Sequence, residues 1–259
     1  MKMRAWILYF VTLLSLPPLP GQEVVTALRH PVTGGGSAPS YVSGQNCTGG
    51  SGGFSSTVAC TATFTVSIGD EIVVGTSTGL GTATISSCGT NSGTATVTWA
   101  VNSAASNIHD TTNAETTAIC IGHVTGAGTV EPIATWSTGT GDQGIVAADF
   151  SASNNTIDVG VGQANAGSSA TNGNTSGTIT TTVNHDALIS LVEDSSGTGA
   201  TISAGTTSVT FAKIICTTSF GGQDCLEWGQ QTAAASGTKA AWTFNNTDRN
   251  LVSMVALEP

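Results

Sequence analysis

A period of two residues between apolar side chains constrains the fold of this chain most. In residues 94–101, Ala95, Val97, Trp99 and Val101 alternate with threonine and other small residues. Such alternation is typical of a β-strand with one buried face and one exposed face. The same pattern is present at 57–66, 156–161 and 240–244. Threonine suits the exposed face because β-branched side chains favour pleated surfaces.

Four other stretches are apolar on both faces and predict central, fully buried strands. These stretches are 72–74, 145–148, 188–192 and 251–257. The segment 69–75, a polar turn leading into an apolar strand, is the expected centre of the buried wall. Clusters of Gly, Asn and Ser separate the strands, and the part after the leader has no convincing helical period. The pattern predicts an all-β, two-sheet sandwich of jelly-roll type over residues 40–259.

The first 21 residues have the features of a secretory signal peptide. A short basic region with Lys2 and Arg4 precedes the apolar run 5–16, and three prolines follow before Gly21. The apolar run is too short to span a bilayer as a mature helix. We therefore expect cleavage near Gly21 and a secreted or cell-surface protein without a membrane span; the alternative is a retained N-terminal anchor.

Six cysteines in an exported chain favour disulfides over metal binding. No CxxC pair or histidine-rich spacing indicates a zinc site. Six cysteines allow 15 connectivities, of which we favour the pairing of neighbours. The predicted bonds are Cys47–Cys60, Cys88–Cys120 and Cys216–Cys225, the last one closing a hairpin.

Residues 22–39 form a separate segment at the start of the mature chain. Val24, Val25, Ala27 and Leu28 belong to a short strand-like piece, and the Gly- and Pro-containing stretch that follows reads as a flexible tether. One interpretation is an edge strand of the same domain. The other is a donor strand that adds to a neighbouring subunit.

Several strand motifs occur in a recognisable order along the chain. They are GDEIVV at 69–74, IVAADFS at 145–151, GTITTT at 177–182 followed by ALISLV at 187–192, and SMVAL at 253–257. Their order resembles a broad group of uncharacterised Gly/Thr-rich β-sandwich proteins, secreted or on bacterial surfaces, and also found among phage structural proteins. The resemblance implies a sandwich fold and no catalytic residues. The cysteines depart from that group and point to an extracellular setting.

Charge excludes nucleic acid as an expected partner. Loss of Lys2 and Arg4 with the leader leaves four basic residues against 16 acidic ones. Binding to a phosphate backbone requires a basic surface that displaces counterions. We therefore expect no nucleic-acid binding.

Catalytic motifs are weak, and no enzyme is predicted. The sequence around Ser77 matches G-x-S-x-G, but the nucleophile elbow needs a helix after the turn, and a strand is expected there instead. Glu193 is among the carboxylates expected to face water at strand ends. A pair of carboxylates close in space, as in a glycosidase, is invisible at this level.

Two ligand sites are conceivable from residue chemistry alone. Asp110, Asn113 and Glu115 lie in one predicted loop and offer oxygen ligands for calcium. No other cofactor is expected. Trp228 follows Cys225 closely and is the best candidate for an exposed aromatic platform that contacts glycans.

Three functions remain in order of preference. The first is an extracellular structural protein that self-assembles into a surface layer or filament through β-strand addition. The second is a carbohydrate-binding or adhesion module, and the third is a secreted hydrolase. The fold alone selects none of them, because sandwiches support many functions.

Overall fold

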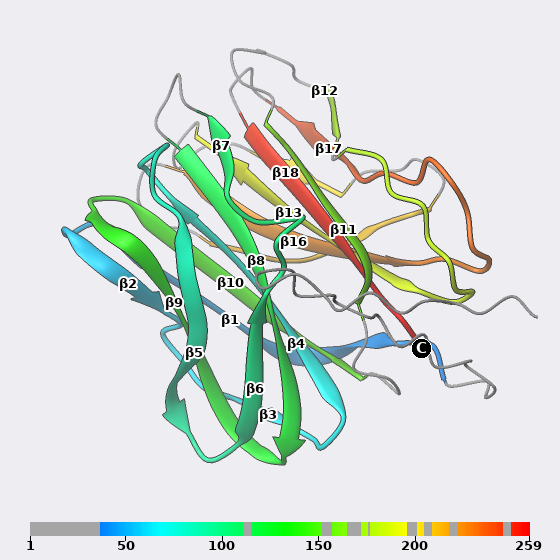
Figure 1. The fold of residues 1–259 in the computed structure, drawn as a ribbon, viewed down its shortest axis with the longest axis horizontal. Helices are drawn as coiled ribbons and strands as arrows, with labels where there is room; N and C mark the ends of the chain where they lie inside the picture. The colour runs from blue at the N-terminus through cyan, green and yellow to red at the C-terminus, as the bar shows by residue number, and fades with distance from the viewer. Residues whose placement is uncertain are drawn as a thin grey trace, which may run out of the picture. The chain divides into compact units, whose positions relative to one another are not determined.

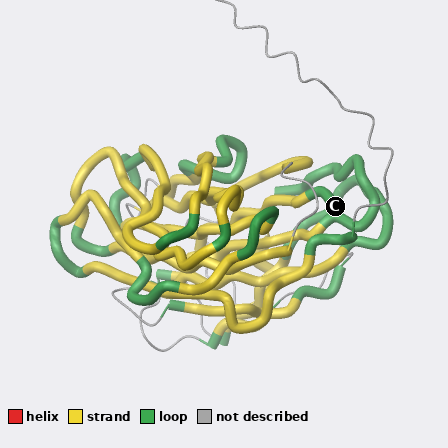
Figure 2. The backbone as a smooth tube through the Cα atoms, turned by 90° about the horizontal axis from the view of Figure 1, so that it is seen from below, coloured by secondary structure: helices red, strands yellow, loops and turns green. Residues whose placement is uncertain are grey.

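The computed structural model of the protein describes residues 37–110, 115–151, 157–164, 172–175, 177–195, 201–204, 209–217, 222–245 and 250–259. The predicted signal peptide, residues 1–21, and the strand at 22–28 lie outside the described residues. Within them, eighteen strands form four antiparallel sheets and there is no helix (Figure 2). No described helix is therefore long and apolar enough to cross a membrane.

Sheet A and sheet B form a sandwich from residues 40–151, which we call the N-terminal sandwich (Figure 1). Sheet A contains β1 (Ser40–Ser51), β4 (Asp70–Thr78), β6 (Thr96–Val101), β7 (Ile108–Asp110), β8 (Glu115–Gly126) and β10 (Gln143–Ser151). Sheet B contains β2 (Ser55–Ala59), β3 (Phe64–Val66), β5 (Ile85–Gly93) and β9 (Gly128–Thr140).

Sheet C and sheet D form the C-terminal sandwich from residues 157–257 (Figure 1). Sheet C contains β11 (Ile157–Ala164), β13 (Ala187–Asp194), β15 (Ala212–Cys216), β16 (Gln223–Gln230) and β18 (Asn250–Leu257). Sheet D is much smaller and contains β12 (Asn172–Thr175), β14 (Ile202–Ser203) and β17 (Ala241–Phe244).

The two sandwiches repeat one strand order. Sheet A runs β1-β10-β4-β8-β6 and sheet C runs β11-β18-β13-β16-β15, so each places the first strand of its half beside the last. In the outer sheets, β9 lies between β2 and β5, and β17 lies between β12 and β14. This is the arrangement of a jelly roll. The predicted disulfide-braced β-sandwich is thus confirmed, but the described chain forms two jelly rolls in tandem where the sequence pattern predicted one.

Sheets A and C are buried on both faces. In β4, Ile72 and Val74 pack into a core shared with sheet B, whereas Val73 packs into a core shared with sheet C. In β13, Ile189 faces sheet A and Leu188 packs into a core on the sheet D side. The two sandwiches therefore contact each other through sheets A and C, within one compact unit. This packing explains why the four apolar stretches show no alternation: their strands lie inside sheets A and C.

The three disulfides have the predicted pairing, Cys47–Cys60, Cys88–Cys120 and Cys216–Cys225. The first joins β1 of sheet A to the residue that follows β2 of sheet B. The second joins β5 of sheet B to β8 of sheet A. The third joins register partners on the neighbouring strands β15 and β16. Covalent bonds therefore cross the N-terminal sandwich, whereas the C-terminal bond stays within one sheet.

Two details differ from the alternation pattern. The predicted strand at 57–66 is broken into β2 and β3, because Cys60 and Thr61 turn toward Pro132 and Thr48. In β11, Ile157 packs into the core between sheets A and C, whereas Val159 packs on the sheet D side. A register shift between these two residues turns them to opposite faces, where simple alternation predicted a common one.

Candidate functional site

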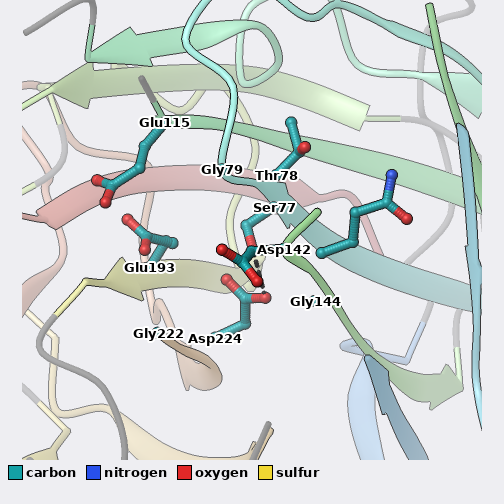
Figure 3. Close-up of a pocket in the computed structure, with 10 residues that line it drawn as sticks. Ser77, Thr78, Gly79, Glu115, Asp142, Gly144, Glu193, Gly222 and Asp224 are labelled. Carbon is teal, nitrogen blue, oxygen red and sulfur yellow. Dashed lines mark hydrogen bonds between the residues drawn. The ribbon is translucent and has the colours of Figure 1, made fainter. Parts of the chain in front are cut away.

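Carboxyl side chains from both sandwiches meet in a pocket at one end of the interface between sheets A and C (Figure 3). The pocket is small, with a volume of about 70 Å³, and it opens to solvent. We call it the acidic pocket; its lining residues are Ser77, Thr78, Gly79, Glu115, Asp142, Gln143, Gly144, Glu193, Gly222 and Asp224.

Sheet C supplies the two deepest carboxyl groups of the acidic pocket. Glu193 near the end of β13 and Asp224 near the start of β16 are register partners across the sheet. Register partners on one face have Cβ atoms about 4.5–5.5 Å apart, and like charges in that position repel. Glu193 is 5% exposed and Asp224 is 2% exposed. The prediction that Glu193 faces water at a strand end is therefore wrong, because sheet A covers that end.

Sheet A supplies the opposite wall of the acidic pocket. Ser77 in β4 donates a hydrogen bond of 2.7 Å from its hydroxyl to Oδ2 of Asp224. Gly144 in β10 is the register partner of Ser77, and a Cβ atom there would lie 1.9 Å from the same Oδ2. The close approach of the Asp224 carboxyl to β10 therefore requires glycine at this position.

Two further acids complete the acidic pocket. Glu115 is the first residue of β8, and its carboxyl group hydrogen-bonds with that of Glu193. Asp142 lies in the turn between β9 and β10 and is exposed to solvent. Figure 3 shows the carboxyl groups of these residues and of Asp224 turned toward a common space.

Burial and the charges of neighbouring acids favour the protonated form of Glu193 and Asp224. Burial raises the pKa of Glu193 well above its usual range, and the charges of Glu115 and Asp224 raise it further. Burial also raises the pKa of Asp224 to about 7, although the hydrogen bond from Ser77 lowers it. The hydrogen bond between the carboxyl groups of Glu115 and Glu193 requires a proton between them, which agrees with the raised pKa of Glu193.

The opposite end of the same interface has a different chemistry. His123 in β8 contacts Glu71 in β4, with 2.6 Å between Nδ1 and Oε1. The side chain of His123 is partly exposed, whereas that of Glu71 is buried. Burial raises the pKa of Glu71 to about 7, while the contact with His123 lowers it. Sequence reasoning missed this pair because its members are separated by 52 residues.

The structure places two of the three predicted calcium ligands, Asp110 and Glu115, side by side on neighbouring strands. Asp110 is buried in β7 as the register partner of Glu115, and Asn113 lies outside the described residues. In the described part of the chain, no three His, Cys, Asp or Glu side chains are arranged to hold a metal ion. The calcium prediction for this trio stays a prediction.

Trp228 is half-buried at the interface between sheets A and C. Its ring lies edge-on to that of Phe150, with centroids 6.2 Å apart. The part of the ring in this contact cannot also stack on a sugar. The glycan prediction for Trp228 likewise remains untested.

The chemistry available in the acidic pocket is that of proton exchange and cation binding. Ser77 lies in strand β4, and the next described regular element is β5, so a helix does not follow it. No histidine is among the described residues that line the pocket, so Ser77 has no imidazole base there. Sequence reasoning did not identify Glu193 and Asp224 as site residues. The available signal was that Glu193 directly follows the continuous apolar stretch 188–192, which indicates a carboxyl group at the end of a buried strand.

Comparisons of this chain with protein-family models, with curated proteins and with solved structures found no match.

Proposed function

We propose that this protein is an extracellular structural subunit that assembles with copies of itself by β-strand addition. Three disulfides and no free cysteine support folding in an oxidising environment. Residues of sheets A and C are buried on both faces. A rigid body of this kind offers new partners its strand edges more readily than its sheet faces.

The edge strand β15 carries the proposal. Among the described strands, β15 is paired only with β16, so its other edge ends sheet C. Its Ile214 and Ile215 are only half-buried against the core between sheets A and C. Lysine often guards such an edge, but Lys213 instead donates to the carbonyl oxygen of Ile202, 2.7 Å away. An added strand would pair with this edge and cover the isoleucines.

The chain has its own candidate for that added strand. Val24, Val25, Ala27 and Leu28 supply apolar side chains to both faces of an extended segment. The eleven residues from 29 to 39 span at most about 36–40 Å when extended. Residues 22–28 can therefore add to a neighbouring subunit whose free edge lies within that distance of residue 40. The competing arrangement is addition to an edge of the same molecule.

Deletion of residues 22–35 tests the proposal. Electron microscopy and analytical ultracentrifugation of the mature protein should show filaments or layers, and the deletion variant should remain monomeric. The double substitution V24D/L28D should have the same effect, because charges on this face oppose burial against β15. E23Q, a change at the start of the same segment, is the matched control and should assemble normally.

Two results would contradict the proposal. One is a deletion variant that assembles as well as the intact protein. The other is an intact mature protein that stays monomeric, with residues 22–28 protected from hydrogen exchange in the monomer. The second result would assign the segment to an edge of its own molecule.

A further inference from the structure

We propose that the acidic pocket is a calcium site that ties the C-terminal sandwich to the N-terminal sandwich. The ligands would be the carboxyl groups of Glu193 and Asp224 from sheet C, with Glu115 and Asp142 on the other side and the hydroxyl of Ser77. The site differs from the predicted trio of Asp110, Asn113 and Glu115, with which it shares only Glu115.

Unpaired carboxyl oxygens point to a ligand in addition to the grouping of acids. Oε2 of Glu193 and Oδ1 of Asp224 are both buried and have no hydrogen-bond partner among the described residues. Native structures rarely leave buried polar atoms unsatisfied, so each such atom needs an explanation. A bound cation would satisfy both oxygens at once.

Glycines hold this space open. A Cβ atom at Gly144 would lie 1.9 Å from Oδ2 of Asp224, and one at Gly222 would lie 2.9 Å from Oε1 of Glu193. Each of the two sheet C carboxyl groups therefore lies against a glycine. Larger side chains at 144 and 222 would occupy the places in which these carboxyl groups lie.

The charge balance of the molecule also favours a cation from solution. Lys213 and Lys239 are the basic Lys or Arg residues within the described part, and Lys213 is bonded to the carbonyl of Ile202. Glu193 and Asp224 are not part of the ion pair that the structure shows between His123 and Glu71. Like charges at this density are stable only when they are protonated or neutralised by a bound cation.

Calcium fits the acidic pocket better than magnesium. The described side chains do not form a preorganised coordination site, so the carboxyl groups on separate strands must move closer together when the cation binds. Calcium accepts six to eight oxygen ligands in flexible geometry, whereas magnesium demands a near-ideal octahedron and loses water reluctantly. Calcium sites of extracellular modules have dissociation constants on the order of 0.1–1 mM.

The test measures calcium binding and thermal unfolding of the full mature protein. Calorimetric titration with CaCl₂ at about pH 7.5 should give a dissociation constant on the order of 0.1–1 mM. Saturating calcium should raise the unfolding temperature by about 5 °C relative to EDTA. Because the carboxyl groups must lose protons to bind the ion, the affinity should fall at least tenfold at about pH 5.

Two substitutions separate a calcium site from an ordinary group of buried acids. E193Q and D224N replace carboxyl groups whose ionisation the folded state opposes but the unfolded chain allows, so in EDTA at about pH 7.5 each variant should unfold at a higher temperature than the wild type. The same variants should bind calcium at least tenfold more weakly. Calcium should also raise their unfolding temperature much less than it raises that of the wild type. A higher unfolding temperature in EDTA together with weaker calcium binding is not expected if Glu193 and Asp224 have only a structural role.

D149N is the matched control. Asp149 in β10 is a buried carboxyl group with a raised pKa, and it faces the sheet B side of sheet A. Its substitution should raise the unfolding temperature in EDTA and leave calcium binding unchanged. The proposal is overturned if no calcium binding is detected at a calcium concentration about ten times the expected dissociation constant. It is also overturned if magnesium at that concentration raises the unfolding temperature as much as calcium does. It is also overturned if E193Q and D224N bind calcium like the wild type.

Discussion

The two jelly rolls share a strand order but are stabilised differently. In the N-terminal sandwich, two disulfides connect sheet A to sheet B, and β9 of sheet B is 13 residues long. In the C-terminal sandwich, the one disulfide joins adjacent strands of sheet C, and the strands of sheet D have two to four residues. Its outer sheet is held in the described part by side-chain packing. Two sandwiches with the same strand order can thus be stabilised differently, the N-terminal one by disulfides between its sheets and the C-terminal one by side-chain packing between its sheets.

Tryptophans at equivalent strands show the difference most directly. Trp136 in β9 and Trp242 in β17 are both buried, and each belongs to the central strand of its outer sheet. Nε1 of Trp242 donates a hydrogen bond of 2.9 Å to Oγ of Ser190 in sheet C, whereas Nε1 of Trp136 has no partner among the described residues. The central strand of sheet D is therefore linked to sheet C by a tryptophan hydrogen bond that Trp136 in β9 does not make within the described residues.

The largest expected effect is the loss of Trp242. W242A should lower the free energy of unfolding by about 3–5 kcal/mol, because it leaves a large cavity between sheets C and D. W242F should cost more than W136F, since only the former leaves a buried hydroxyl without its donor. Urea denaturation of the four variants, including W136A, measures this. Equal costs for the two phenylalanine variants would show that the hydrogen bond to Ser190 is not what distinguishes the sandwiches.

Removal of disulfides should give the next largest effect. The bond Cys88–Cys120 closes 32 residues and the bond Cys216–Cys225 closes nine. From loop-closure entropy, C88A/C120A should cost about 4 kcal/mol and C216A/C225A about 2.5 kcal/mol. Urea unfolding of both double variants tests the ranking. A larger loss for the C-terminal pair would mean that β15 needs its disulfide for pairing and not only for entropy.

Stability should fall as the pH rises from about 4 to 8. Burial raises the pKa of Asp149 to about 8 in the N-terminal sandwich and that of Asp186 to about 7 in the C-terminal sandwich. In the unfolded chain such groups lose their protons near pH 4. Between these values the folded state binds more protons than the unfolded state, so the free energy of unfolding decreases with rising pH.

Thermal unfolding at a series of pH values measures this dependence. The wild type should unfold at a higher temperature near pH 4.5 than near pH 8.5, by several degrees (roughly 2–4 °C for each kcal/mol). D186N should remove the part of the decrease that ends near pH 7, and D149N the part that extends to about pH 8. An unfolding temperature that increases with pH throughout this range would contradict the assigned protonation.

The smallest effects are expected at two equivalent turns. Gly69 before β4 has φ = 90°, and His185 before β13 has φ = 68°. A side chain in this region costs roughly 1–2 kcal/mol, part of which is offset by the greater freedom of glycine in the unfolded chain. H185G should therefore stabilise the protein by about 0.5 kcal/mol, and G69A should destabilise it by about 0.5–1 kcal/mol. Thermal denaturation that gave the same sign for both would show that contacts of the imidazole outweigh its backbone strain.

Local patterns predicted the elements of this fold well. Alternation and continuous apolar runs identified most of the strands, including 72–74 and 188–192 at the centres of their sheets, because each residue of a strand sees one of two environments. Neighbouring cysteines paired as expected, since short loops keep them close together. The break between β2 and β3 was missed because it depends on hydrogen bonds to Pro132 and Thr48, which are distant in sequence.

The acidic pocket could not be predicted in the same way. Ser77 and Asp224 are 147 residues apart and meet only because the two sandwiches pack through sheets A and C. Carboxylates at strand ends usually face water, and nothing in the sequence near Glu193 and Asp224 indicates that another sheet covers them. Coverage by the second jelly roll turns them into buried groups with raised pKa values.

By itself, the sequence determined most of the strands, the buried faces of most of them and the disulfide pairing, because these depend on side chains within a few residues or on nearby cysteines. Only the tertiary structure decided that the strands form two jelly rolls and that acids from both meet in one pocket. The reason is that a strand pattern marks which face is buried but carries no information about which sheet covers it.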